Sequence, residues 1–251
     1  MLVNVSLLGS LIFRKSEERA ALRRMEAELV ELFATHGITL EAGAISWEAP
    51  PAPVTMARSE DLEQSVAEFL LGQDLRGASQ GGINSYQSAA GSIQFRSSGG
   101  FEARLSAPEG EDLCRSFCRT FSYGTPVFQE NGDGSATAAA VFQYGGRPVY
   151  NCTVTFTLTG GALTAVSGTL LPTEGVPTGQ SGLLSAAAAL TAFQQMRRES
   201  GTVGSSILQT YPCYEVQSTP SAATTLMGAW CVVTDISSYY VNCSTGAITV
   251  G

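Results

Sequence analysis

The 251-residue chain is poor in the side chains that carry out most enzymatic chemistry, with one histidine (His36), one lysine (Lys15) and six cysteines. Only 14% of its residues are charged, against the roughly 25% of a typical soluble domain. Its formal net charge is −8, so it lacks the dense basic surface on which nucleic-acid binding depends. These shortages exclude a nucleic-acid-binding protein and leave few routes to catalysis.

The catalytic motifs that come nearest to a match are incomplete. Gly77–Gly81 fits the G-x-S-x-G nucleophile elbow of α/β-hydrolases, but that fold needs a histidine after the serine, and His36 precedes it. We therefore interpret this segment as a flexible linker. A P-loop is excluded because no glycine motif precedes Lys15. We expect no metal, no cofactor and no small-molecule substrate.

The cysteines and carboxylates leave open disulfide bonds and a catalytic pair of carboxylates. Cys114 and Cys118 lie four residues apart and the other cysteines are scattered singly, a pattern that favours buried thiols over a metal site. If the domain is exported, disulfides among Cys213, Cys231 and Cys243 stay open. Two carboxylates could also meet as a glycosidase pair. The second half of the chain offers six for such a pair: Glu130, Asp133, Glu174, Glu199, Glu215 and Asp235.

The N-terminus combines an apolar run with a charged helix. Residues 1–13 (MLVNVSLLGSLIF) are mostly apolar, and as a helix they would span about 20 Å of the roughly 30 Å hydrocarbon core of a bilayer. They predict either an apolar helix or the distal part of a membrane anchor whose beginning is absent from this chain. Within residues 14–36, Glu17–Phe33 has apolar residues at spacings of three and four. This amphipathic helix is either a juxtamembrane stalk, a dimerising helix, or a helix packed on its own domain.

Residues 37–107 predict a first lobe. A proline-rich connector at Trp47–Val54 leads to a helix that Ser59 caps and that ends at Leu71. Three short strands follow, separated by glycine-containing turns. They are expected at Ile83–Ser88, Ser92–Ser97 and Phe101–Ser106.

Residues 108–251 predict a second lobe of the same kind. Helices are expected at Glu109–Phe121 and Leu183–Arg198, and the glycine pairs at positions 145–146 and 160–161 indicate hairpins. The strands are expected at Pro126–Glu130, Ser135–Tyr144, Pro148–Leu158, Ala162–Leu171, Tyr211–Gln217, Ala229–Thr234, Tyr239–Cys243 and Ala247–Val250. The predicted fold class is therefore α+β, with two lobes that each pack a helix on an antiparallel β-meander, preceded by an N-terminal helix.

Several stretches resemble a known family. Leu226–Trp230 (LMGAW) followed by Tyr239–Ile248 (YYVNCSTGAI) resembles the ending of the YycI/YycH family, an apolar-Pro-x-Trp strand and a Tyr-Tyr-Val-Asn-x-x-Thr-Gly hairpin. Gly145–Asn151 (GGRPVYN) is similar to a strand of that family, and Asn4–Phe13 to the distal half of its transmembrane helix. Here Gly228-Ala229 replaces the usual proline, and PepSY-like domains share the final hairpin.

The resemblance implies a non-enzymatic, extracytoplasmic protein of Gram-positive bacteria that modulates a sensor histidine kinase of a two-component system by protein–protein contact. It implies a location at the cell membrane, with a single-pass anchor that is truncated in this chain. The residues expected at the partner interface are Leu7, Leu8, Gly9, Ser10, Leu11, Trp230, Tyr239, Tyr240 and Asn242.

Two other hypotheses stay open beside the kinase regulator. The first is a PepSY-like protease-inhibitory or chaperone module that shares the final hairpin without the kinase partner. The second is a cell-envelope hydrolase that uses paired carboxylates.

Overall fold

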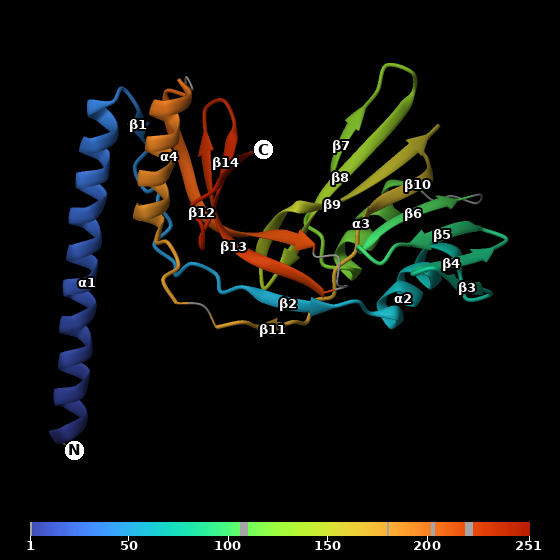
Figure 1. Ribbon diagram of the computed structural model, residues 1–251, viewed down its shortest axis with the longest axis horizontal. Coiled ribbons are helices and arrows are strands. Elements are labelled where there is room, and N and C mark those ends of the chain that lie inside the picture. Colours follow the sequence, from blue (N-terminus) through green and yellow to red (C-terminus); the bar gives the residue numbers. More distant parts are fainter. Residues whose placement is uncertain (1, 106–109, 180, 202–203, 219–222) are drawn as a thin grey trace. The chain divides into compact units, whose positions relative to one another are not determined.

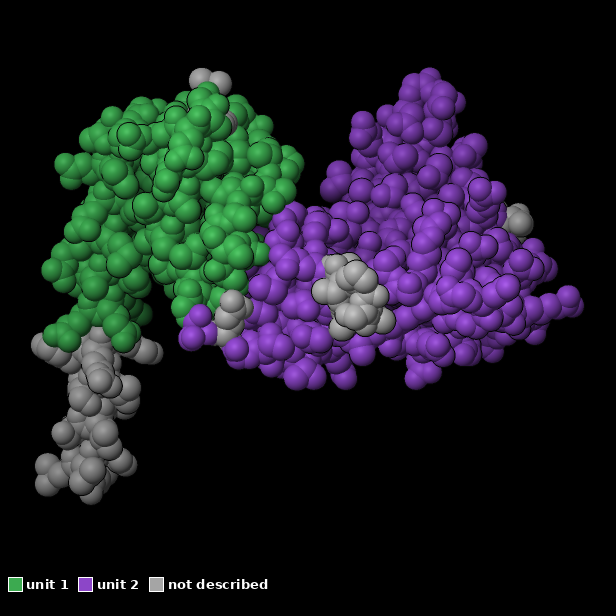
Figure 2. Space-filling view, in the orientation of Figure 1, with its two compact units in different colours: residues 1–50, 182–212, 229–251 green, residues 51–181, 213–228 purple. Residues whose placement is uncertain are grey.

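The computed structural model describes residues 2–105, 110–179, 181–201, 204–218 and 223–251; the side chains of residues 2–16, 218 and 223 lie outside that description. Helices and strands are both well represented, and the predicted α+β class is confirmed. The chain divides into two compact units (Figure 2). Unit 1 comprises residues 1–50, 182–212 and 229–251, and unit 2 comprises residues 51–181 and 213–228.

Unit 1 packs two helices against a small sheet (Figure 1). In that sheet β1 runs parallel to β12, and β13, β14 and β15 form an antiparallel meander. The long strands β12 and β13 are each divided between the two units. The elements with residues in unit 1 are α1 (Leu2–Thr35), β1 (Thr39–Leu40), α4 (Ala186–Ser200), β12 (Ser206–Ser218), β13 (Ala223–Thr234), β14 (Ser238–Asn242) and β15 (Ile248–Val250).

Helix α1 joins the apolar run and the charged helix into one continuous element of 34 residues. It ends just before Gly37, whose φ of +71° is a conformation that glycine adopts without a steric penalty. The amide of Ile38 donates to the carbonyl oxygen of Phe33 and turns the chain back. Of the described side chains of α1, Leu29 and Phe33 are buried, so its last two turns attach it to unit 1.

Helix α4 forms the other side of the unit 1 core. Ser185 caps its first turn by accepting a hydrogen bond from the amide of Ala188, and Gly201 ends it in the left-handed conformation. Its inner face buries Leu190 and Phe193.

Unit 2 is an antiparallel sheet with two helices on one face. The strand order is β7-β8-β9-β10-β6-β5-β4-β3, and β2 pairs with β11 and β13 nearby. The elements are β2 (Val54–Ala57), α2 (Glu60–Leu71), β3 (Arg76–Gln80), β4 (Ile83–Ser88), β5 (Gly91–Phe95), β6 (Gly100–Leu105), α3 (Glu111–Thr120), β7 (Val127–Glu130), β8 (Ser135–Tyr144), β9 (Arg147–Thr159), β10 (Ala162–Thr169) and β11 (Val176–Pro177).

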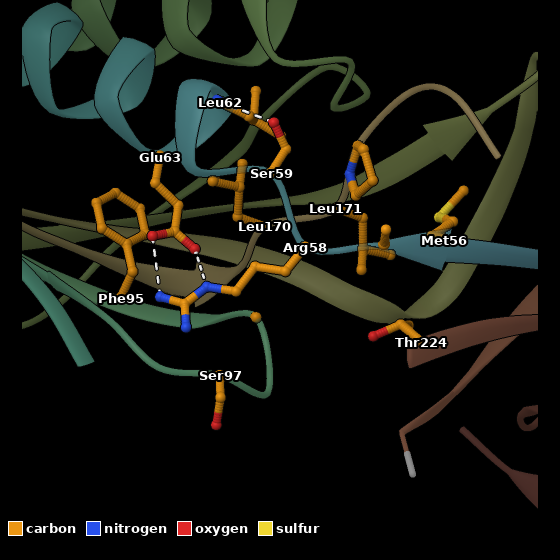
Figure 3. Close-up of a pocket in the computed structure, with 13 residues that line it drawn as sticks. Met56, Arg58, Ser59, Leu62, Glu63, Phe95, Ser97, Leu170, Leu171 and Thr224 are labelled. Atoms are coloured by element: carbon orange, nitrogen blue, oxygen red, sulfur yellow. Dashed lines mark hydrogen bonds and ion pairs between the residues drawn. The ribbon is translucent and has the colours of Figure 1, made fainter. Parts of the chain in front are cut away.

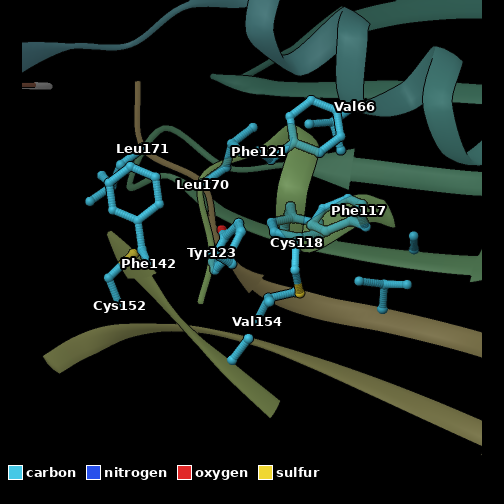
Figure 4. Packing of buried hydrophobic residues seen from close by; sticks show 14 of the residues in the cluster. Val66, Phe117, Cys118, Phe121, Tyr123, Phe142, Cys152, Val154, Leu170 and Leu171 are labelled. Atoms are coloured by element: carbon cyan, nitrogen blue, oxygen red, sulfur yellow. The ribbon is translucent and has the colours of Figure 1, made fainter. Parts of the chain in front are cut away.

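The core of unit 2 follows from the alternation that the sequence shows. In β9, Val154, Phe156 and Leu158 point inward while the threonines between them point toward solvent. Phe117 of α3 stands on this sheet, with its ring centroid 5.5 Å from that of Phe156 in an edge-to-face contact. Figure 4 shows Phe117 and Cys118 in the buried cluster formed between helix and sheet.

One interpretation of the sequence was wrong. The segment Gly77–Gly81, expected as a flexible linker, contains most of β3, which pairs with β4 from Arg76 opposite Gln87 to Gln80 opposite Ile83. All five residues of β3 are exposed, so the strand has no apolar alternation that could reveal it. The lobe boundary expected at residues 107 and 108 lies outside the described residues.

Candidate functional site

Trp230 was expected at a partner interface and lies in the interior of unit 1. It is fully buried on β13, and its Nε1 donates a 2.8 Å hydrogen bond to the carbonyl oxygen of Leu184, just before α4. This bond satisfies the one polar group of the indole. In the protein by itself, Trp230 therefore ties the meander to the start of α4.

The other residues of the C-terminal motif lie on β14. Tyr239 is buried against Phe193, with the ring centroids 4.9 Å apart. Asn242 is also buried, and its Oδ1 accepts hydrogen bonds from the amides of Ser244 and Thr245, which closes the turn before β15. Tyr240, opposite Cys231 in the register, is half-buried and has the more accessible side chain of the two tyrosines. The prediction that these residues contact a partner stays untested.

The expected N-terminal interface residues, Leu7–Leu11, belong to α1, but their side chains lie outside the described residues. Over the part of the chain that the structure describes, no helix combines the length and the apolar character needed to cross a bilayer. The membrane contact of this segment therefore stays a prediction.

A buried charge pair that the sequence did not indicate lies at the start of α2. Arg58 binds Glu63 in a bidentate manner, with Nε–Oε1 at 2.5 Å and Nη2–Oε2 at 3.0 Å (Figure 3). Glu63 is only 4% exposed and also accepts from Nδ2 of Asn84 on β4, at 2.8 Å. The hydrogen bond to Glu63 raises the pKa of Arg58. Since Arg58 also donates to the carbonyl oxygen of Gly82, the pair fastens α2 to the β3–β4 hairpin.

The pocket beside this pair is too small for a metabolite. Its volume is about 20 Å³, close to the space of a single water molecule, whereas small-molecule pockets measure roughly 300–1,000 Å³. Leu62, Phe95 and Leu171 close it with apolar side chains. The geometry at Arg58 and Glu63 therefore supports a structural role.

A larger depression lies between α1 and α4 in unit 1, and we call it the α1–α4 groove. Its volume is about 540 Å³. Its lining includes Leu32 and His36 at the end of α1 and Gln194, Gln195, Arg198 and Glu199 of α4. This mixture of apolar, amide and charged side chains suits a protein segment better than a purely apolar ligand.

Gln194 is the unusual residue of the α1–α4 groove. It is 5% exposed, and within the described part of the chain neither its Nε2 nor its Oε1 has a hydrogen-bond partner. A buried carboxamide without partners costs stability, so buried polar groups are nearly always paired in native proteins. In the sequence Gln194 is one of several polar residues of α4, and nothing in the pattern distinguishes it from the others.

The six cysteines are free and buried. Burial raises the pKa of the thiols of Cys118, Cys152 and Cys243 to about 12, which keeps them protonated at neutral pH. The described residues contain no group of three or more histidine, cysteine, aspartate or glutamate side chains that could hold a metal ion. The thiols thus behave as small apolar residues of the two cores.

Two of the six carboxylates considered for catalysis are engaged in hydrogen bonds that hold the local structure. Asp133 accepts from the amide and the hydroxyl of Ser135, and Asp235 accepts from both groups of Ser205. These hydrogen bonds lower the pKa of both carboxyls. Asp133 belongs to unit 2 and Asp235 to unit 1.

Comparisons with known proteins give only distant similarities. No family model matches the chain, and no curated protein matches it, so the resemblance to the YycI/YycH family stays a prediction. An uncharacterized protein from Eubacterium rectale aligns over 85% of this chain and 85% of its own, with 13% identity and a TM-score of 0.44. The YpeB C-terminal domain of Bacillus megaterium aligns over 78% of this chain and 98% of its own, with 10% identity and a TM-score of 0.39. Similarity at this level carries no conclusion about function.

Proposed function

We propose that this chain is a non-enzymatic binding protein that modulates a sensor histidine kinase by direct contact at the extracytoplasmic face of the cell membrane. In this proposal the apolar residues 1–13 contact the membrane and α1 connects them to unit 1. The partner meets the surface of α1 and of unit 1. The resemblance in Tyr239–Ile248 and Gly145–Asn151 suggested the kinase.

The observation that carries the proposal is the exposure of α1. Its 34 residues form a rod about 51 Å long, yet its described residues 17–28 contain no buried side chain. Helices in proteins are stabilised mainly by packing of one face, so a long helix without such packing needs something else against it. A membrane at one end and a protein partner along the rest would supply that packing.

The state of the reactive groups supports a non-enzymatic role. The thiols of Cys118, Cys152 and Cys243 have raised pKa values and no access to solvent, which makes them poor nucleophiles. The carboxylates of Asp133 and Asp235 accept hydrogen bonds from Ser135 and Ser205. A contact-based mechanism needs none of these groups.

Vesicle flotation tests the membrane contact. We expect the full chain to float with anionic phospholipid vesicles and the Leu7→Asp/Leu11→Asp variant to stay in the dense fraction, because two buried charges oppose insertion. Val30→Asp, at a position 40% exposed on the same helix, is the control and should float like the wild type. Flotation that does not depend on Leu7 and Leu11 would contradict the proposed tether.

Photo-crosslinking in cells tests the partner. A photoreactive amino acid at Arg24, exposed on α1, should crosslink to a histidine kinase, whereas the same group at Gln80, exposed on β3, should not. Crosslinks from Gln80 alone, or the absence of any kinase among the products of Arg24, would refute the proposal.

A further inference from the structure

The described part of α1 has an apolar surface that unit 1 does not cover. Met25 and Leu32 are 41% and 38% exposed, and they lie seven residues apart, two turns along one face of the helix. Leu32 lines the α1–α4 groove, so this apolar surface is continuous with it. Two anchors at this spacing are typical of a helix that receives another helix.

The groove and α1 carry charges of opposite sign. Arg198 lines the groove, and no ion pair among the described residues includes it. Glu28 lies between Met25 and Leu32 on the same face of α1, and none of these ion pairs includes it either. The carboxylate on α1 therefore complements the guanidinium in the groove.

We propose that the α1–α4 groove binds α1 of a second copy of this chain and forms a two-fold symmetric dimer. In a two-fold interface the same surface of each copy meets itself. Helix α1 fits this symmetry because it lines the groove and also carries Met25, Glu28 and Leu32, the residues that would enter the groove of the other copy. Met25 and Leu32 of each copy cover those of the other. Glu28 of each copy pairs with Arg198 of the other.

This inference goes beyond the proposed kinase contact, because it concerns a second copy of the chain. In the dimer α1 contributes Met25, Glu28 and Leu32, so Arg24 stays available to the kinase.

Sedimentation equilibrium of the full chain tests the dimer. We expect a reversible dimer, and Leu32→Glu should weaken it at least about 100-fold because it places a carboxylate in an apolar contact. Val30 is 40% exposed, nearly the same as Leu32, but lies about 200° around the helix from it, so Val30→Glu should change the affinity less than about 3-fold. Circular dichroism of both variants checks that the fold is retained.

Charge reversal tests the pairing across the interface. Arg198→Glu and Glu28→Arg should each weaken the dimer about 10-fold at low salt, and the double reversal should restore it to within about 3-fold of the wild type.

Three results would overturn the dimer. The first is a chain that stays monomeric at a concentration of about 100 µM. The second is a dimer that Leu32→Glu and Val30→Glu affect equally. The third is a double reversal that does not recover the affinity. If the groove of such a monomeric chain binds another protein, the groove is assigned to that protein.

Discussion

Removing Arg58 while leaving Glu63 in place should destabilise unit 2 strongly. The Arg58→Met variant would leave a carboxylate that is 4% exposed with one remaining hydrogen bond, from Asn84. Breaking one side of a buried ion pair typically costs 3–5 kcal/mol. The Arg58 side chain is 21% exposed, so solvent reaches the pair and weakens it. We therefore expect the free energy of unfolding to fall by about 3 kcal/mol, near the lower end of that range.

The double variant Arg58→Met/Glu63→Leu separates the stranded charge from the loss of the pair. It removes both charges and leaves only Asn84 without its acceptor, so we expect a cost of about 1 kcal/mol relative to the wild type. The double variant should thus be more stable than Arg58→Met alone. A double variant that is more stable than the single one would show that most of the cost comes from the unpaired buried carboxylate.

Urea unfolding followed by far-ultraviolet circular dichroism measures these free energies of unfolding. Both tryptophans, Trp47 and Trp230, belong to unit 1, so fluorescence does not report on unit 2. Hydrogen exchange of the amides in α2 and β4 locates the effect. A loss below about 1 kcal/mol for Arg58→Met, or a double variant less stable than the single one, would refute the reasoning.

Three further changes test other parts of the structure. Gly228→Ala should cost about 1–3 kcal/mol in thermal unfolding because the new Cβ would overlap the carbonyl oxygen of Pro51, whereas Gly132→Ala, in open space, should be nearly neutral. Trp230→Phe should lower the free energy of unfolding by about 1–3 kcal/mol, measured by urea titration, because the carbonyl oxygen of Leu184 loses its indole donor. Since burial raises the pKa of Cys118, Cys152 and Cys243 from 9.0 to about 12, unfolding releases their protons above pH 9. Stability should therefore fall as the pH rises from 9 toward 12, and a free energy of unfolding that is flat over that range would contradict this.

The elements with strong periodicity were predicted well from the sequence. The bounds predicted for β4 and β8 agree with the structure, and Ser59 caps α2 as expected. Apolar alternation and capping residues are local signals that need no knowledge of the rest of the fold. The short strands β1 and β11 were missed because each has two residues and exists through pairing with a distant segment.

The environment of the motif residues could not be predicted from the sequence. The pattern around Trp230 and Asn242 was interpreted as a possible surface, yet the strand pairing and α4 place both inside unit 1. At Gly228 the backbone of Pro51 passes so close that a side chain has no room, and this long-range contact gave no signal in the sequence. The pair of Arg58 and Glu63 was not evident either, because the partners lie five residues apart across a helix start.

The central proposal is that this protein acts by contact and not by turnover. The direct test is a titration with the kinase that photo-crosslinking identifies. Increasing amounts of the full chain are added to a fixed amount of this kinase in vesicles, and the rate of autophosphorylation is measured. If the chain acts by binding, the change in rate should saturate near equal amounts of the two proteins. A full effect at a hundredth of that amount would require each copy to act many times, and it would contradict the account.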